Sequence, residues 1–346
     1  LLLLNDRGQH MNPQCPSRKS DGHCFLAKLA LGALRGVLES RQGGFHAPYA
    51  AKEERTVMAK LLLGKPVIDS LREELKGRIA ALEERGVKPG LAIVRVGARP
   101  DDLAYERTAL KRAAGLGIRA RTITLPENAS QEELMDVIAW VNSDPSIHGC
   151  LMFRPLPEQF DEEAVCDALD PAKDVDGIGR GSMAAVFTGR GPGYAPCTAA
   201  ACIEMLDAYD IPIAGKRVVV VGRSLVVGKP VSVLLLDRHA TVTTCHSRTG
   251  DLPAIVRKGD VVILATGRAK AYGRDFFHPG QTVLDVGINV DEAGNLCGDA
   301  DFDAIEPIVD AITPVPRGIG GVTTSMLMKH VVEAAEGMVT PSCQTA

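Results

Sequence analysis

The sequence predicts an α/β protein with parallel sheets, and three observations support this. Apolar strands alternate at short range with amphipathic helices from Met58 onward, a pattern that favours parallel strands joined by right-handed crossovers. The four valines at 218–221 run straight into a glycine, as is typical of a strand buried on both faces of a sheet. The chain has 346 residues, which is enough for two domains.

The elements of the first part are delimited by caps, prolines and glycines. Pro66 suits the first turn of a helix in which apolar residues recur every three or four positions. Asp101 or Asp102 is expected to cap a second helix, and Ser130 with Glu133 forms a capping box for a third. The expected elements are helices 66–84, 101–114, 131–142 and 161–169 and strands 91–96, 118–125 and 149–153.

The second part of the pattern follows a glycine-rich stretch, residues 179–193, which we interpret as a hinge region. The last helix is expected to pack back on the first part of the chain. The expected elements are helices 198–209, 231–236 and 322–335 and strands 218–221, 241–245, 261–265 and 282–285. The expected domains are residues 58–193 with 313–337, and residues 194–312, followed by a tail at 338–346.

The segment after the valine strand has the outline of a nucleotide-phosphate site. Gly222 allows a sharp turn at the strand end, and Gly228 allows the next helix to pack close to the sheet. Arg223 and Ser224 lie between them, beside the helix N-terminus that presents free N–H groups to an anion. The spacing differs from the common G-x-G-x-x-G, so a plain strand–turn–helix connection remains the alternative.

The end of the second strand of this unit favours NADP over NAD. An NAD enzyme usually has an acidic residue there, about 20 residues after the glycine turn, to bind the ribose. This chain has no acid between Cys245 and Thr249, but it has Ser247 and Arg248, and Arg223 joins them from the first turn. Such donors suit a 2′-phosphate. The alternative is that the arginines are solvated loop residues.

Charge and hydropathy exclude several classes of partner. The formal net charge is −4, which argues against nucleic acid or an anionic membrane surface as the main partner. No apolar run approaches the roughly 18 residues of a membrane span. Residues 1–57 are irregular, and we expect a disordered extension or a mis-assigned upstream translation. Scattered acidic residues there weaken the further alternative of a transit peptide.

The cysteines and histidines indicate neither a disulfide framework nor a metal site. Nine cysteines are present without a C-x-x-C pair, which favours reduced, buried thiols and a cytoplasmic protein. His148 and His246 have no partner at metal-ligand spacing, so no metal is expected.

Three further features admit both a functional and a structural interpretation. Tyr105 lies on the second expected helix, where core packing is the commoner role of a tyrosine. Asp174 and Asp176 lie in a loop that ends in glycine, where a turn or a cap is the commoner explanation. The loop 314–321 either lines a pocket or serves as a linker.

Long motifs in the chain match a known family. The matching segments are 219–224 with 227–230 (VVVGRS, VGKP), 240–249 (ATVTTCHSRT), 173–177 (KDVDG), 285–289 (DVGIN) and 312–316 (ITPVP). From about Met58 to Ala335 the chain therefore resembles the bifunctional methylenetetrahydrofolate dehydrogenase/methenyltetrahydrofolate cyclohydrolase family. The resemblance implies an N-terminal α/β catalytic domain and a Rossmann-like NAD(P)-binding domain with a cleft between them, usually in a homodimer.

The resemblance also implies roles for particular residues. Tyr105 would stack on the pterin ring of the folate, and Asp176 would accept hydrogen bonds from the pterin's amino and ring nitrogens. Phe153 stands at a substrate-contact position. The expected cofactor contacts are Gly222, Arg223, Ser224, Gly228, Ser247, Arg248 and Ile288. The segment Pro314, Val315 and Pro316 would edge the folate site.

The chain departs from the family pattern on the catalytic side. The family has a lysine, used in the cyclohydrolase step, four residues after its tyrosine, and Ala109 stands there. Lys111 is about 240° round the helix from Tyr105 and should face elsewhere. The other departures are Asp102 for serine, Phe153-Arg154-Pro155 for Gln-Leu-Pro, Ala199-Ala200-Ala201 for Pro-x-Gly, and Arg317 and Gly321 for glycine and proline.

These departures predict an NADP-dependent dehydrogenase with weak or absent cyclohydrolase activity. Hydride transfer from the methylene bridge requires mainly positioning, since a folate nitrogen stabilises the product cation. Hydrolysis requires an activated water, and loss of the lysine should cost about 10²- to 10⁴-fold. Two alternatives remain: a related dehydrogenase with an altered, pterin-like substrate, and a non-catalytic protein that binds nucleotide and folate.

Overall fold

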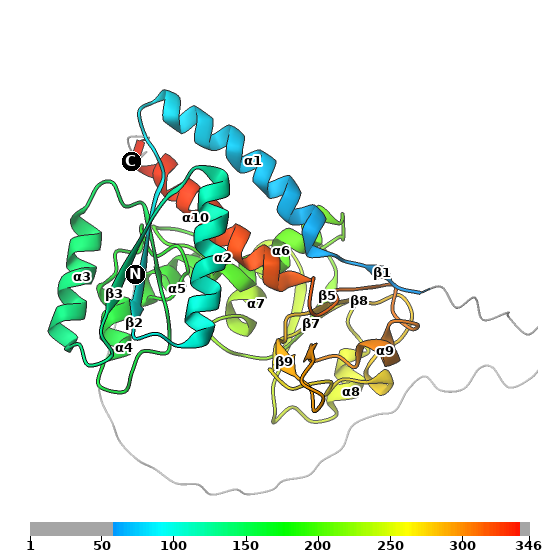
Figure 1. Ribbon diagram of the computed structural model, residues 1–346. Coiled ribbons are helices and arrows are strands. Elements are labelled where there is room, and N and C mark those ends of the chain that lie inside the picture. Colours follow the sequence, from blue (N-terminus) through cyan, green and yellow to red (C-terminus); the bar gives the residue numbers. More distant parts are fainter. Residues whose placement is uncertain (1–57, 340–346) are drawn as a thin grey trace, which may run out of the picture. The chain divides into compact units, whose positions relative to one another are not determined.

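The computed structural model describes residues 58–339 (Figure 1), and the expectations for residues 1–57 and 340–346 lie outside it. Two wholly parallel sheets are present in this part of the chain. One has three strands in the order β3-β2-β4, and the other has six in the order β1-β11-β8-β7-β5-β6. The parallel α/β architecture is therefore confirmed, with a short antiparallel pair, β9 and β10, in addition.

The first part of the described chain builds the three-stranded sheet and contributes one strand, β1, to the six-stranded sheet. Its elements are β1 (Lys60–Leu61), α1 (Gly64–Glu84), β2 (Gly90–Val96), α2 (Pro100–Leu116), β3 (Arg119–Leu125), α3 (Gln131–Ser143), β4 (Gly149–Met152), α4 (Glu162–Ala168) and α5 (Arg180–Thr188). The strand β2 is buried along its whole length, which explains its run of apolar residues.

The second part builds most of the six-stranded sheet. Its elements are α6 (Cys197–Ala208), β5 (Arg217–Val221), α7 (Gly228–Asp237), β6 (Thr241–Cys245), α8 (Leu252–Val256), β7 (Val261–Leu264), η1 (Arg274–Phe276), β8 (Thr282–Asp285), β9 (Asn289–Val290), β10 (Leu296–Cys297), α9 (Phe302–Ile305), β11 (Ala311–Ile312) and α10 (Ile319–Val339). The valines of β5 are buried at both faces, as their sequence predicts.

Two local expectations are wrong. Neither Asp101 nor Asp102 caps α2, because the helix begins one residue earlier, at Pro100, and both acids lie in its first turn. A proline at the first helical position suits the helix start, since its missing N–H has no partner there anyway. The glycine-rich stretch 179–193 is not an open link, because the helix α5 occupies residues 180–188.

Other local expectations are confirmed. Ser130 and Glu133 form the capping box, with the Ser130 hydroxyl 3.1 Å from the Glu133 amide and a Glu133 carboxylate oxygen 2.7 Å from the Ser130 amide. The strand β1 was not expected. It pairs Lys60 and Leu61 with Ala311 and Ile312 of β11, and two residues are too few to produce a periodic signal.

The helix α10 joins the parts of the fold. It contacts α1, α2, α6, β2 and β4, so the expected packing on the first part is confirmed. Leu327, Val331 and Ala335 are fully buried on it and belong to a core that also contains Ile93 of β2 and Val218 of β5. Burying each leucine or valine side chain contributes about 1.5–3 kcal/mol.

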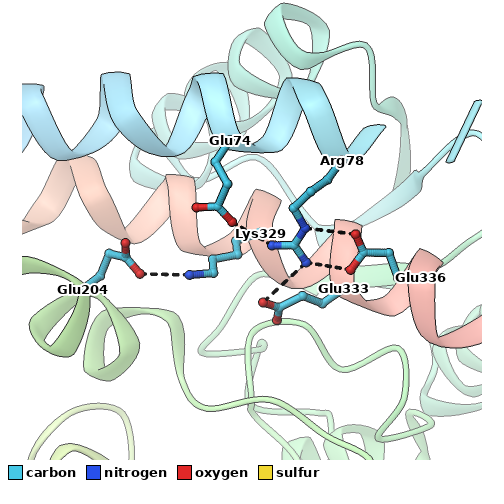
Figure 2. Close-up of polar contacts among 6 residues, drawn as sticks. All are labelled: Glu74, Arg78, Glu204, Lys329, Glu333 and Glu336. Carbon is cyan, nitrogen blue, oxygen red and sulfur yellow. Dashed lines mark hydrogen bonds and ion pairs between the residues drawn. The ribbon is translucent and has the colours of Figure 1, made fainter. Parts of the chain in front are cut away.

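Polar contacts complete this packing, as Figure 2 shows. Arg78 of α1 makes a bidentate contact with Glu336 of α10, at 2.9 and 2.7 Å, and a further bond of 2.9 Å to Glu74. Lys329 of α10 lies 3.0 Å from Glu204 of α6. The Glu336 carboxylate holds the pKa of the Arg78 guanidinium above its usual range, despite partial burial.

Candidate active site

Three strand ends meet at the carboxyl edge of the six-stranded sheet. The strand β5 lies between β6 and β7, with Val221 level with Cys245 on one side and with Leu264 on the other. The segments that leave these strands therefore start side by side. This edge is where open parallel sheets bind ligands.

Two glycines shape the turn that leaves β5. Gly222 has φ +133°, and a Cβ there would collide with the carbonyl oxygen of Ala265. A Cβ on Gly228 would collide with the carbonyl oxygen of Gly222. The helix α7 begins at Gly228, so its N-terminus lies directly against the turn. Such an N-terminus favours an anion because its first N–H groups have no partner within the helix.

The expected phosphate donors lie exposed at this edge. Arg223 and Ser224 follow the first turn, and Ser247 and Arg248 follow β6. The second turn is held by its own hydrogen bonds, since the Arg248 amide donates to the His246 ring at 3.2 Å. Both arginines are without an ion pair among residues 58–339, which leaves their guanidinium groups free for a ligand.

The segment after β8 is fixed by buried carboxylates. Asp285 accepts hydrogen bonds from the amides of Gly287, Asp299 and Ala300 at 2.8–3.0 Å. Burial raises the pKa of Asp285 to about 6, against the opposing effect of these bonds. The fixed backbone leaves Ile288 projecting, with 67% of its surface exposed.

The loop before α10 faces Ile288 across a small cavity. This cavity has a volume of about 190 Å³ and is lined by 285–288, Leu296 and 314–321. Within the loop Pro314 is buried, Val315 is half-buried and Pro316 is exposed. The loop therefore lines a pocket, and its linker interpretation is set aside.

The two aspartates of the loop 173–177 differ in whether backbone amides already use their carboxylates. The Lys173 ammonium donates to three carbonyl oxygens at the end of α3, at 2.8–2.9 Å. Asp174 accepts from the amides of Ile178 and Gly179 at 3.0 and 2.8 Å, so it stabilises the turn. Asp176 accepts no hydrogen bond from a backbone amide of residues 58–339, so its carboxylate is available to a ligand.

Asp176 lies beside a buried thiol and imidazole that the sequence did not suggest. Desolvation raises the pKa of Asp176 to about 6, and the charge of Asp174 adds to this, although a hydrogen bond from the Cys197 thiol opposes it. The Cys197 thiol also lies 3.3 Å from the Val175 carbonyl oxygen, to which the ring of His330 is bonded at 2.8 Å. Burial lowers the pKa of His330 to about 4, so the ring is neutral near pH 7.

A cavity of about 350 Å³ joins the two sides of the site. It is lined by Asp176 and Arg154 from the first part of the fold and by Cys197 of α6 with Leu225 and Val226 of the turn after β5 from the second part. Its further lining includes Glu162, Arg180, Met183 and Thr198. The sequence-based expectations did not include Leu225 and Val226. The available signal was two apolar residues in a turn between Gly222 and Gly228, and the structure shows that both are exposed.

Tyr105, which is close enough to Asp176 to feel its charge, packs against Phe153. Their rings meet edge to face, with centroids 5.9 Å apart and an angle of 86°. Burial raises the pKa of the Tyr105 hydroxyl, and the charge of Asp176 adds to the rise, while a hydrogen bond with Thr324 of α10 opposes it. Tyr105 and Asp176 are thus brought together, and Phe153 is buried against the tyrosine.

The position at which the family has its lysine is buried in this chain. Ala109 is fully buried in the core below Tyr105, while Lys111 is exposed on the outer side of α2, as its helical angle predicts.

Within the described residues no group of three or more His, Cys, Asp or Glu side chains could hold a metal ion. The six cysteines described are all unpaired and buried. None of the described helices could span a membrane.

The parallel sheets and the glycine turn at the carboxyl edge of the six-stranded sheet define an α/β protein of the dinucleotide-binding class. A second group of candidate ligand-binding residues, around Asp176, adjoins this edge. Two family models match, the tetrahydrofolate dehydrogenase/cyclohydrolase catalytic domain over residues 62–176 and its NAD(P)-binding domain over residues 196–339. The chain belongs to the tetrahydrofolate dehydrogenase/cyclohydrolase family.

Relatives and solved structures agree with this. The chain is 50% identical to the bifunctional protein FolD of Carboxydothermus hydrogenoformans, over 81% of this chain and 98% of that protein. It is also 50% identical to FolD of Clostridioides difficile, over 80% and 96%. The Campylobacter jejuni FolD structure superposes with a TM-score of 0.78 at 35% identity, over 81% and 99%. The Trypanosoma brucei enzyme, complexed with NADP and inhibitor, gives 0.76 at 35%, over 81% and 98%.

Proposed function

We propose that this chain is an NADP-dependent dehydrogenase of folate one-carbon metabolism with weak or lost cyclohydrolase activity. It oxidises 5,10-methylenetetrahydrofolate to 5,10-methenyltetrahydrofolate. One observation carries the proposal: Asp176 lines the same cavity as Leu225 and Val226 of the glycine turn. A pterin on Asp176 and a nicotinamide cofactor at the turn would therefore share one space.

The residues present fit NADP. Gly222 and Gly228 would approach the phosphates, and Arg223, Ser247 and Arg248 offer exposed donors without an acid among them. These donors favour a 2′-phosphate over a bare ribose hydroxyl. Ile288 is exposed at the neighbouring strand end, where it would contact the cofactor.

The residues on the other wall fit a folate. Asp176 would accept hydrogen bonds from the pterin's amino group and ring nitrogen, and Tyr105 would stack against the ring. Phe153 holds Tyr105 from behind by the edge-to-face contact. The segment 314–316 would border the folate where it faces Ile288.

The dehydrogenase step then requires mainly orientation. When bound, NADP accepts the hydride, and a folate nitrogen stabilises the resulting cation, so the protein needs no base. Asp176 and Tyr105 hold the pterin, while the glycine turn fixes the cofactor's phosphates. Asp176 accepts hydrogen bonds from the pterin only when its carboxyl group is ionised. Because its pKa is raised to about 6, this condition is met at pH values above about 6.

The hydrolytic step lacks its expected group. Ala109 carries no proton-transfer function, and the adjacent Phe153 has no polar atom to replace the family's glutamine. Asp102 lies one helical turn away from Tyr105 and is paired with Arg99 at 2.8 Å. We therefore infer that a bound methenyl product is released rather than efficiently hydrolysed.

A paired assay tests both halves of the proposal. Purified full-length protein is supplied with methylenetetrahydrofolate and either NADP or NAD, and the methenyl product is followed by its absorbance. Formation with NADP at a rate well above that with NAD is expected, and absence of turnover with both cofactors refutes the dehydrogenase. Hydrolysis of added methenyltetrahydrofolate as fast as its formation refutes the second half.

A second candidate keeps the enzyme class and changes the substrate. Arg154 places a guanidinium in the cavity beside Asp176, in an ion pair of 3.6 Å with Glu162. A pterin-like molecule with an added anionic group would pair with this guanidinium in place of Glu162. Competition between tetrahydrofolate and such an analogue separates the candidates.

We further propose a cytoplasmic homodimer. The strand β3 forms the outer edge of its sheet, pairs only with β2 within the described residues, and is seven residues long. Such a free edge is a ready template for pairing with a second chain. The free, buried thiols suit a reducing compartment. Light scattering after gel filtration gives the mass, and a monomer at micromolar concentration contradicts the dimer.

A further inference from the structure

A second cavity lies beside α2 and shares no lining residue with the cavity of Asp176. It has a volume of about 690 Å³, which is within the size range of small-molecule sites. Its walls come from α1, α2 and α10. The lining residues are Ile68, Arg72, Leu75, Ala104, Arg107, Thr108, Lys111, Arg112, Gly115, Leu116 and Ser325.

The charged residues in this lining are all cationic. Arg72, Arg107, Lys111 and Arg112 line the cavity, and no carboxylate does. Arg107 and Lys111 form no ion pair with any residue of the described chain, and Arg72 lies 3.6 Å from its neighbour Glu73. Four cations around one concave space produce a local positive potential in a chain whose net charge is negative.

Of the four cations, Arg112 gives the strongest indication of an anionic ligand. Its guanidinium is half-buried, and its hydrogen-bond partner in the described chain is the hydroxyl of Ser325 on α10. Burial lowers its pKa, and no carboxylate among the described residues compensates for the lost hydration. A desolvated cation without a counter-charge is costly unless a ligand supplies one.

The floor of the cavity is apolar. Ile68, Leu75 and Leu116 form it, below the ring of cations. Inorganic phosphate would use the charges and leave this surface in water. A ligand with methylene groups between its charges would cover the floor and pair with the cations at the same time.

We propose that this cavity binds an oligocarboxylate, a flexible organic anion with two or more carboxylates separated by methylene groups. Two sources share this chemistry. One is the glutamyl chain of a folate bound at Asp176; Ser325 lies next to Thr324, whose hydroxyl bonds to Tyr105. This first source rests on the proposed function. The other source is a free oligocarboxylate that binds independently of folate.

Calorimetry on the full-length protein tests the site directly. The probes are free tri-γ-glutamate and, for comparison, inorganic phosphate. The expected result is saturable binding of tri-γ-glutamate that weakens with salt, with phosphate much weaker. The double variant Arg107→Ala/Lys111→Ala should lose about tenfold or more in affinity, because each cation contributes a charged hydrogen bond.

A matched variant controls for net charge. Arg190→Ala/Lys258→Ala removes the same two charges from exposed positions that do not line the cavity. It should bind tri-γ-glutamate like the native chain. Equal weakening in both double variants, or binding that neither variant changes, overturns the site.

Kinetics separates the two sources. The readout is the ratio of KM values for methylenetetrahydrofolate carrying one and three glutamates. A ratio of about 5 or more that falls to about 1 only in Arg107→Ala/Lys111→Ala identifies the folate chain. A ratio near 1 in all proteins, with cavity-dependent binding of the free peptide, identifies a free oligocarboxylate.

The remaining outcomes are also decisive. No peptide binding together with a KM ratio that the Arg107→Ala/Lys111→Ala variant leaves unchanged overturns the proposal. If the protein turns over no folate, the proposed function fails, and calorimetry still decides the cavity on its own.

Discussion

Phe153 stands edge-on to Tyr105, with ring centroids 5.9 Å apart, and belongs to the same core cluster as the fully buried Ala109. The family places a glutamine and a lysine at the positions of Phe153 and Ala109. Two polar groups are thus replaced by an aromatic contact and a small apolar side chain, and neither of these two side chains can transfer a proton. The proposed loss of hydrolysis therefore rests on these two positions.

Restoring both polar residues should restore hydrolysis. The double variant Ala109→Lys/Phe153→Gln is expected to raise methenyltetrahydrofolate hydrolysis by about 10²-fold or more, as general acid–base catalysis contributes 10² to 10⁴. The control Ala113→Lys/Phe153→Gln buries a lysine at an equally buried position one turn further along α2. Equal hydrolysis in the two variants would show that position 109 is not the cause.

The affinity for folate should depend on the ionisation of Asp176. Its pKa is about 6, and only the ionised form accepts both pterin donors. The KM for folate is therefore expected to fall as the pH rises through about 6, and Asp176→Asn should show a high KM without this dependence. An unchanged pH profile in Asp176→Asn would assign the titration to another group.

The same carboxyl should make the fold less stable at higher pH. A pKa raised from 3.8 to about 6 means that the folded chain binds the proton more tightly than the unfolded chain. Its stabilising effect is complete below about pH 4 and is lost as the pH rises through about 6. The difference in unfolding free energy between Asp176→Asn and the native chain should therefore shift by about 2 kcal/mol in favour of the variant between pH 4 and pH 7.5, measured by urea unfolding. Equal pH dependence in both proteins would refute this.

Arg248 should decide between the two cofactors. Removing its guanidinium in Arg248→Ala is expected to raise the KM for NADP by about tenfold and to leave that for NAD almost unchanged. Lys258→Ala removes an exposed charge from the same part of the fold and should change neither value. A parallel loss for NADP and NAD would place Arg248 away from the 2′-phosphate.

The contact between Arg78 and Glu336 should contribute measurably to stability. It is bidentate and partly shielded, with side chains 25% and 36% exposed. A double-mutant cycle to alanine is expected to give a coupling of about 1 kcal/mol, at the upper end for partly exposed pairs. The pair Lys65–Asp69 is 80% and 45% exposed and should give about 0–0.5 kcal/mol. Similar coupling in both pairs would contradict the shielding.

The backbone conformation at position 317 should make glycine more stabilising there than a residue with a Cβ. Its φ of +88° lies in the left-handed region, which costs a residue with a Cβ about 1–2 kcal/mol. Arg317→Gly is expected to be about 1 kcal/mol more stable than Arg317→Ala, which keeps the strain, as thermal unfolding would show. A less stable glycine variant would mean that chain entropy outweighs the strain.

The sequence by itself determined the local elements and the cofactor side of the site. The buried valines of β5, the Ser130–Glu133 capping box and the glycines of the turn act over a few residues, so spacing predicts them. It did not reveal β1, whose two residues acquire their role by pairing with β11, 251 residues away in the chain. It also left a helix, α5, inside a supposed hinge, because glycines at its two ends hid it.

Only the tertiary structure decided which residues share a space. Asp174 and Asp176 look alike in the sequence, but the first is used by two backbone amides and the second faces the cavity with Cys197. Ala109 and Lys111 lie two residues apart, yet one is in the core and the other borders a cationic cavity between three helices. Burial and charge pairing depend on elements distant in the chain, and spacing along one segment cannot report them.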